Sequence, residues 1–124
     1  MTETPARRPR DREIKLVVRL DENNVPEEIR WQATDSPEPG PQAAEAFLLS
    51  LWDADSQTSL RIDLWTKKLQ VDHMNAFVLQ NLFTLADTFQ NATGNEERAE
   101  EIRAFAGDLA ARLELPPETG GSGT

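Results

Sequence analysis

The sequence predicts an α+β fold, in which a four-stranded antiparallel meander is followed by two helices packed on one face of the sheet. In the first half of the chain, apolar and polar residues alternate, a period typical of half-buried strands. From residue 72 onward, apolar residues recur every three or four positions, as they do in amphipathic helices. Runs of strands followed by runs of helices are typical of the α+β class.

The first two predicted strands form a hairpin. Residues 13–20 alternate between apolar and polar side chains, and the polar sequence DENN follows as a turn. The dipeptide Val25-Pro26 favours extended geometry, after which residues 29–33 resume the alternation. Residues 35–42 contain three prolines and a glycine, so we expect a surface loop there.

A second hairpin is expected over residues 43–66. Residues 43–53 fit a buried helical turn as well as a strand, because their apolar run shows no clear period. The polar sequence ADSQT separates them from residues 59–66, which alternate cleanly. Two apolar runs of similar length around a short polar turn favour a hairpin.

Two helices complete the predicted domain. The apolar stripe of residues 72–91 predicts the first helix, with Asp72 as its N-cap and Gly94 as its stop. Asn95 is the expected N-cap of the second helix, which ends before Pro116. We expect a core in which strand residues meet helix residues, namely Ile14, Leu16, Val18, Ile29, Leu60, Ile62 and Leu64 against Met74, Phe77, Leu82, Leu85, Phe89, Phe105 and Leu109.

Composition narrows the possible functions. The 124 residues suit one domain, which we place at residues 13–115, between a disordered basic arm at 1–12 and a flexible Pro/Gly/Ser tail at 116–124. A net charge of −9 disfavours binding to nucleic acid or to anionic membranes. With no apolar leader and no long apolar run, we expect a cytoplasmic protein without membrane insertion.

Catalytic and metal-binding patterns are weak in this sequence. It contains no cysteine and one histidine, His73, which falls in the first turn of a predicted helix, where exposed residues are common. Asp53 and Asp55 resemble the start of a calcium loop, but the glycine and glutamate that complete such a loop are missing, so a turn held by local hydrogen bonds fits better. We therefore expect no enzyme activity, no metal and no cofactor.

The strongest functional signal is the placement of aromatic and basic residues on the predicted strands. Trp65 alternates onto the face opposite Leu60, Ile62 and Leu64, and Trp52 shares that face with Leu48. Tryptophan and arginine are enriched in binding hot spots, whereas arginine stems lying over indole rings can also simply cover such a face. Both interpretations remain open, and the partner in the first could be a second copy. The candidate partner-binding residues are Trp52, Arg61, Asp63, Trp65, Arg30 and Arg19, with Val17 beside them.

Several sequence runs resemble one known family. They are LDENNVPEEIRWQA at 20–33, AFLLSLWD at 46–53, LRIDLWTK at 60–67, VDHM at 71–74 and ADTF at 86–89. Together they are similar to the gliding motility-associated protein GldC family of Bacteroidetes, in order, over residues 14–115. The resemblance implies a small cytoplasmic accessory protein of the gliding apparatus, linked to the type IX secretion machinery, and it implies no catalytic residues.

Residues and resemblance thus agree on a non-enzymatic interaction protein, whose expected partner is a gliding or secretion component or a second copy of the chain. The alternative is a small-molecule carrier, or an enzyme of unrecognised type, with a pocket between sheet and helices lined by Trp31, Phe77 and Phe83.

Overall fold

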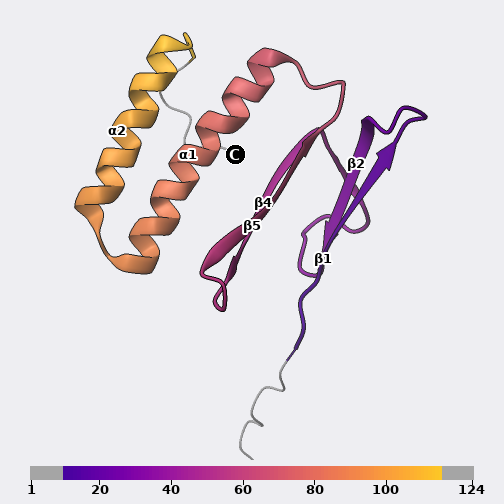
Figure 1. Cartoon of the computed structure of the whole chain (residues 1–124), viewed down its shortest axis with the longest axis horizontal. Coiled ribbons are helices and arrows are strands. Elements are labelled where there is room, and N and C mark those ends of the chain that lie inside the picture. The colour runs from indigo at the N-terminus through magenta and orange to yellow at the C-terminus, as the bar shows by residue number, and fades with distance from the viewer. Residues whose placement is uncertain (1–9, 116–124) are drawn as a thin grey trace, which may run out of the picture. The chain divides into compact units, whose positions relative to one another are not determined.

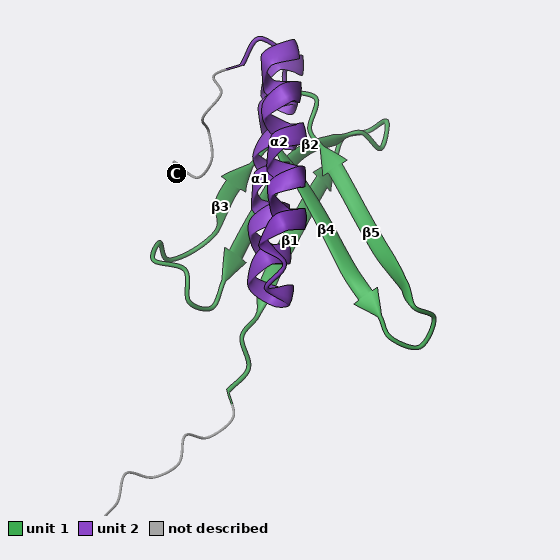
Figure 2. Ribbon diagram, turned by 90° about the vertical axis from the view of Figure 1, so that its left-hand side faces the viewer, with its two compact units in different colours: residues 1–69 green, residues 70–124 purple. Residues whose placement is uncertain are grey.

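The computed structural model describes residues 10–115, so the predicted arm at 1–12 lies largely outside it and the predicted tail at 116–124 lies wholly outside it. The element order is five strands followed by two helices (Figure 1). The chain divides into two compact units, residues 1–69 and residues 70–124, coloured separately in Figure 2. The α+β class is confirmed.

The first unit contains a three-stranded antiparallel sheet in the order β1-β2-β3. Its strands are β1 (Ile14–Leu20), β2 (Pro26–Ala33) and the short β3 (Gln42–Ala44). Ile29 lies on the central strand, pairs with Val18 on β1 and Ala44 on β3, and is fully buried. Directly paired residues share a face of a sheet, so the predicted alternation of β1 and β2 is confirmed.

The turn between β1 and β2 depends on one carboxylate. Oδ1 of Asp21 accepts hydrogen bonds from the backbone N–H groups of Asn23 (2.7 Å) and Val25 (3.0 Å). Asn24 takes a left-handed conformation, with φ of 63°, which asparagine tolerates better than most residues. The sequence DENN therefore forms the expected turn.

A separate two-stranded antiparallel sheet follows, made of β4 (Ala46–Asp53) and β5 (Thr58–Trp65). The strand interpretation of residues 43–53 is thus correct from Ala46 onward. Asp53 organises the connecting turn, because its carboxylate accepts hydrogen bonds from the Asp55 N–H (3.1 Å) and the Ser56 hydroxyl (2.9 Å). The expectation that Asp53 serves a local turn is confirmed.

The predicted single four-stranded meander is wrong, because the strands divide between two sheets. Residues 42–44, expected to end a loop and begin a long strand, instead pair with β2 as β3. Only Glu45 separates β3 from β4, so the chain leaves one sheet and enters the other at that residue. The Thr66 N–H donates to the Glu45 carbonyl (2.9 Å), and the Lys67 N–H donates to the Pro26 carbonyl (3.3 Å), which ties the end of β5 to both regions.

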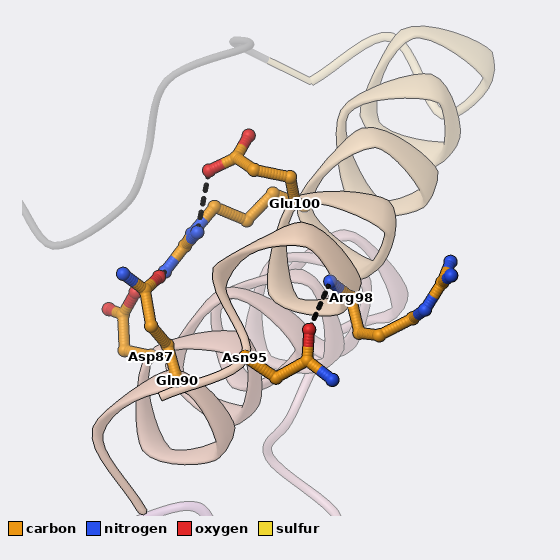
Figure 3. Close-up of polar contacts among 6 residues, drawn as sticks. Asp87, Gln90, Asn95, Arg98 and Glu100 are labelled. Carbon is orange, nitrogen blue, oxygen red and sulfur yellow. Dashed lines mark hydrogen bonds and ion pairs between the residues drawn. The ribbon is translucent and has the colours of Figure 1, made fainter. Parts of the chain in front are cut away.

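The second unit is a helical hairpin of α1 (Val71–Thr93) and α2 (Glu96–Arg112). The expected stop at Gly94 is confirmed, with φ of 74°, as is the cap at Asn95, whose side chain accepts from the Arg98 N–H at 3.1 Å (Figure 3). Asp72 was wrongly expected to cap α1. Gln70 is the N-cap and makes no side-chain cap hydrogen bond, so Asp72 lies in the first turn.

The two helices contact each other largely through small residues. Leu79 on α1 packs with Ala106 and Ala110 on α2, and all three are buried. Small side chains let helix axes approach closely, so this contact uses alanines where the sequence suggested large residues. Leu85 and Phe105, two members of the predicted core, are 57% and 60% exposed.

Arg103 adds a polar link between the helices. Its Nη2 donates to Asp87 Oδ1 (2.8 Å) and Gln90 Oε1 (2.8 Å) on α1, while Nη1 donates to Glu100 Oε2 (2.6 Å) on α2 (Figure 3). These contacts, first with Asp87 and then with Glu100, raise the pKa of Arg103.

Neither helix of the described residues is long and apolar enough to cross a membrane. Packing of the helices on a sheet face stays a prediction.

Candidate functional site

The two faces of the β4–β5 hairpin carry different kinds of side chain. Its register pairs Leu48 with Asp63, Ser50 with Arg61 and Trp52 with Ser59. Because paired residues share a face, one side of the hairpin is mixed and the other is apolar. The mixed side, here called the tryptophan face, consists of Ala46, Leu48, Ser50, Trp52, Ser59, Arg61, Asp63 and Trp65. The opposite, apolar face carries Phe47, Leu49, Leu51, Leu60, Ile62 and Leu64.

Both tryptophans of this face are open to solvent. Trp52 is 66% exposed and Trp65 is 54% exposed. Trp52 pairs with Ser59 near the turn, whereas Trp65 pairs with Ala46 at the other end of the hairpin. Trp65 lies six positions beyond Ser59 on β5, which places the backbones of the two tryptophans about 20 Å apart along the hairpin. The alternation of the sequence predicted this shared face.

Arg61 and Asp63 lie between the two tryptophans. Both are exposed, and within residues 10–115 neither forms an ion pair. They are two residues apart on the same strand, so their side chains project from the same face. The face therefore presents one cation and one anion that are available to a partner.

Arg19 and Arg30 belong to the other sheet. Arg19 pairs with Glu28 across β1 and β2, and Arg30 pairs with Val17. Oε1 of Glu28 lies 3.4 Å from Nη1 of Arg19 and 3.6 Å from Nη1 of Arg30, so the two arginines share one carboxylate. The structure thus places four of the six candidate residues on the tryptophan face and two on the three-stranded sheet.

A surface cavity at one end of the tryptophan face was missed by sequence reasoning. Its volume is about 450 Å³, within the range of ligand pockets. Asp63 and Trp65 belong to both the tryptophan face and this cavity. No pattern in a single sequence indicates that residues 25–26 lie next to residues 63–67. We call it the Trp65 cavity, and its lining residues are Val25, Pro26, Asp63, Leu64, Trp65 and Lys67.

An ion pair stands beside this cavity. Nζ of Lys67 donates to Oδ2 of Asp21 at 2.7 Å, across 46 residues of sequence. This hydrogen bond, together with the one from the Val25 N–H, lowers the pKa of Asp21 from 3.8 to about 2. The same contact raises the pKa of Lys67. Both groups are therefore charged at neutral pH, and each neutralises the other.

A smaller cavity of about 260 Å³ lies on the three-stranded sheet and includes Trp31, Arg30 and Lys15. The alternative function given under Sequence analysis, a small-molecule carrier, also used Trp31, in a pocket lined together with Phe77 and Phe83. Phe83 packs against the buried cluster between α1 and α2. Phe77 lies on α1 in the second unit, and a pocket shared by these three residues stays a prediction.

Within the described residues, no three His, Asp or Glu side chains are grouped so that they could hold a metal ion. His73 is exposed in the first turn of α1. The polar and aromatic groups that line the Trp65 cavity are the Trp65 indole, the Asp63 carboxylate and the Lys67 ammonium, whose charge Asp21 compensates. Such a set of groups can bind a ligand by stacking and by charge.

Comparison with curated proteins and with solved structures found no match. Comparison with protein families gave one match, over residues 26–115, to the family described as gliding motility-associated protein GldC-like. The match begins at β2 and includes the tryptophan face, both helices and every lining residue of the Trp65 cavity except Val25. This chain belongs to the GldC-like family of gliding motility-associated proteins.

Proposed function

We propose that this chain is a non-enzymatic accessory protein that binds a protein partner through the tryptophan face. The observation that carries the proposal is the exposure of Trp52 and Trp65 beside Arg61 and Asp63, which form no ion pair within residues 10–115. Tryptophan and arginine contribute most to binding energy when a partner excludes water from them. The face offers both residue types on one hairpin.

Family membership supports a partner from the gliding apparatus, or from the type IX secretion machinery linked to it. Family membership indicates the process, gliding motility, and the tryptophan face is the surface that we propose binds the partner. The resemblance also favours a cytoplasmic location, which fractionation of cells would test. A second copy of the chain is the competing partner, but a net charge of −9 opposes close self-association.

A comparative capture experiment tests the proposal. The tagged full-length chain and a Trp65→Ala/Arg61→Ala variant are used to capture proteins from cells of the source organism, followed by mass spectrometry. We expect a motility or secretion component to be recovered by the wild type and lost with the variant. Circular dichroism checks that the variant keeps its fold, and light scattering reports the oligomeric state of both forms.

The matched control is Phe105→Ala/Arg112→Ala, which removes one exposed aromatic residue and one exposed arginine from the helical unit. This control should retain the partner. If the folded Trp65→Ala/Arg61→Ala variant captures the same component as well as the wild type does, the tryptophan face is not the binding surface. If wild type alone self-associates, the partner is a second copy.

A further inference from the structure

The Trp65 cavity combines an apolar wall with one carboxylate that has no ion-pair partner. Val25, Pro26 and Leu64 line the cavity and supply apolar surface. Asp63 supplies a carboxylate that forms no ion pair within residues 10–115. Arg61, the nearest cation on the same strand, lies beyond ion-pair distance from it. The cavity therefore has an anionic group available for a ligand.

The other charged residue that lines the cavity is already compensated. Lys67 donates to Asp21 at 2.7 Å, and Asp21 is itself held in place by the backbone N–H groups of Asn23 and Val25. A positively charged ligand thus meets a neutral ion pair on this side instead of a free ammonium. Because opposite charges on Lys67 and Asp21 largely cancel, Asp63 is the uncompensated charge among the residues that line the cavity.

Trp65 adds a second preference for positive charge. Trp65 is 54% exposed, lines the cavity and lies two residues from Asp63 on the same face of β5. The face of an indole ring attracts cations, and guanidinium groups stack on it especially well. A guanidinium can also donate two parallel hydrogen bonds to a carboxylate, whereas an ammonium acts as a point charge.

We propose that the Trp65 cavity receives an arginine side chain from a segment of the partner protein. The methylene stem would lie along Val25 and Pro26, with the guanidinium between the Trp65 indole and the Asp63 carboxylate. The volume of about 450 Å³ leaves room for the side chain and part of its backbone. A net charge of −9 attracts a basic segment over long range.

This inference rests on the proposed function, since it names the chemistry of the partner at the same face. The test uses the full-length ¹⁵N-labelled chain and the capped peptide Gly-Ser-Arg-Ser-Gly, followed through the indole N–H signals of the tryptophans. Peptides with citrulline or lysine in place of arginine provide the comparison. Citrulline keeps the shape of arginine without its charge.

We expect the arginine peptide to shift the Trp65 indole signal, and the citrulline peptide to bind at least tenfold more weakly (roughly, for loss of a charge-assisted hydrogen bond). Asp63→Asn should weaken arginine binding by a similar factor. Trp65→Leu removes the indole probe, so it is followed through the backbone N–H signal of Lys67, which also lines the cavity, and it should abolish binding. The matched controls are Asp55→Asn, an exposed aspartate in the β4–β5 turn, and Trp52→Leu at the far end of the tryptophan face. Both controls should bind the arginine peptide like the wild type.

Three results would overturn the inference. One is equal binding of the arginine and citrulline peptides, and another is equal binding of the lysine peptide, which would remove the assignment to arginine. The third is an unmoved Trp65 signal up to about 20 mM peptide, a concentration at which a millimolar Kd would already saturate the site. If the capture experiment still depends on Trp65 and Arg61 in that case, the proposed function stands and the arginine assignment alone fails.

Discussion

Nζ of Lys67 lies 2.7 Å from Oδ2 of Asp21, and this contact joins the β1–β2 turn to the segment that follows β5. Asp21 also accepts two backbone hydrogen bonds within its own turn. One carboxylate thus holds a local turn and a contact between segments 46 residues apart. Lys67 also lines the Trp65 cavity, so loss of the Asp21–Lys67 pair would disturb both the turn and the candidate site.

Asp21→Asn should make the protein less stable at neutral pH and less sensitive to acid. The folded state lowers the pKa of Asp21 from 3.8 to about 2, chiefly through the hydrogen bond from Lys67. This stabilisation is complete above about pH 4 and is lost as the pH falls toward 2, because protonation then costs the folded state its ion pair. Urea unfolding between pH 2 and pH 7 should show wild type and variant converging over that window.

The control for this prediction is Glu22→Gln, which removes a neighbouring carboxylate that forms no ion pair within the described residues. Its stability should follow that of the wild type across the same range. A constant difference between Asp21→Asn and wild type from pH 7 to pH 2 would contradict the role given to the Asp21 charge. A Lys67→Gln variant should bring the pKa of Asp21, measured by NMR titration, back toward its ordinary value.

Alanine should have opposite effects at Gly94 and at Gly107. Gly94 follows α1 with φ of 74°, a left-handed conformation that costs an alanine about 1 kcal/mol. Gly107 lies inside α2, and an added Cβ there would meet nothing within 4 Å. Gly107→Ala should therefore stabilise the protein by about 0.8 kcal/mol through helix propensity. Chemical unfolding of the two variants gives the signs, and a loss on Gly107→Ala would mean that the helix packs there more tightly than it does in the structure.

The strands and helices that could be predicted from the sequence are those with strong periodic patterns. The alternation of residues 14–20 and 58–65, and the helical stripe from Val71, each extend over enough residues to outweigh local ambiguity. The same alternation is sufficient to group Trp52, Arg61, Asp63 and Trp65 on one face. A face of one hairpin is a local property, so local sequence is sufficient to find it.

Features that depend on distant contacts could not be predicted. β3 has three residues, too few to show a period, and the change of sheet happens at the single residue Glu45. Hydropathy ranks Phe105 above Ala106 as a core residue, yet the close approach of two helices favours the smaller side chain. The Trp65 cavity depends on residues near 25 meeting residues near 65, and nothing in either segment alone indicates that contact.

Leu79→Ala should destabilise the helical unit by about 3 kcal/mol, the usual cost of a cavity left by a buried leucine. Leu79 is 1% exposed and packs against Ala106 and Ala110, which are too small to fill the space. The neighbouring Val78 is 44% exposed and provides the control, since Val78→Ala should change the free energy of unfolding by less than about 1 kcal/mol. Similar losses for the two variants would argue against the helix–helix contact described here.

Asn95→Ala should cost about 1 kcal/mol, because Asn95 Oδ1 accepts the hydrogen bond from the backbone N–H of Arg98 in the first turn of α2. Without this acceptor, the Arg98 N–H hydrogen-bonds to water instead, and the first turn of α2 loses its cap. Asn95→Asp keeps an acceptor at the same position and adds a negative charge at the positive end of the helix, so it should be at least as stable as the wild type. Chemical unfolding monitored by the helical circular dichroism signal compares the three proteins. Equal destabilisation of Asn95→Asp and Asn95→Ala would show that the amide N–H₂ group of Asn95, and not its oxygen, holds the cap.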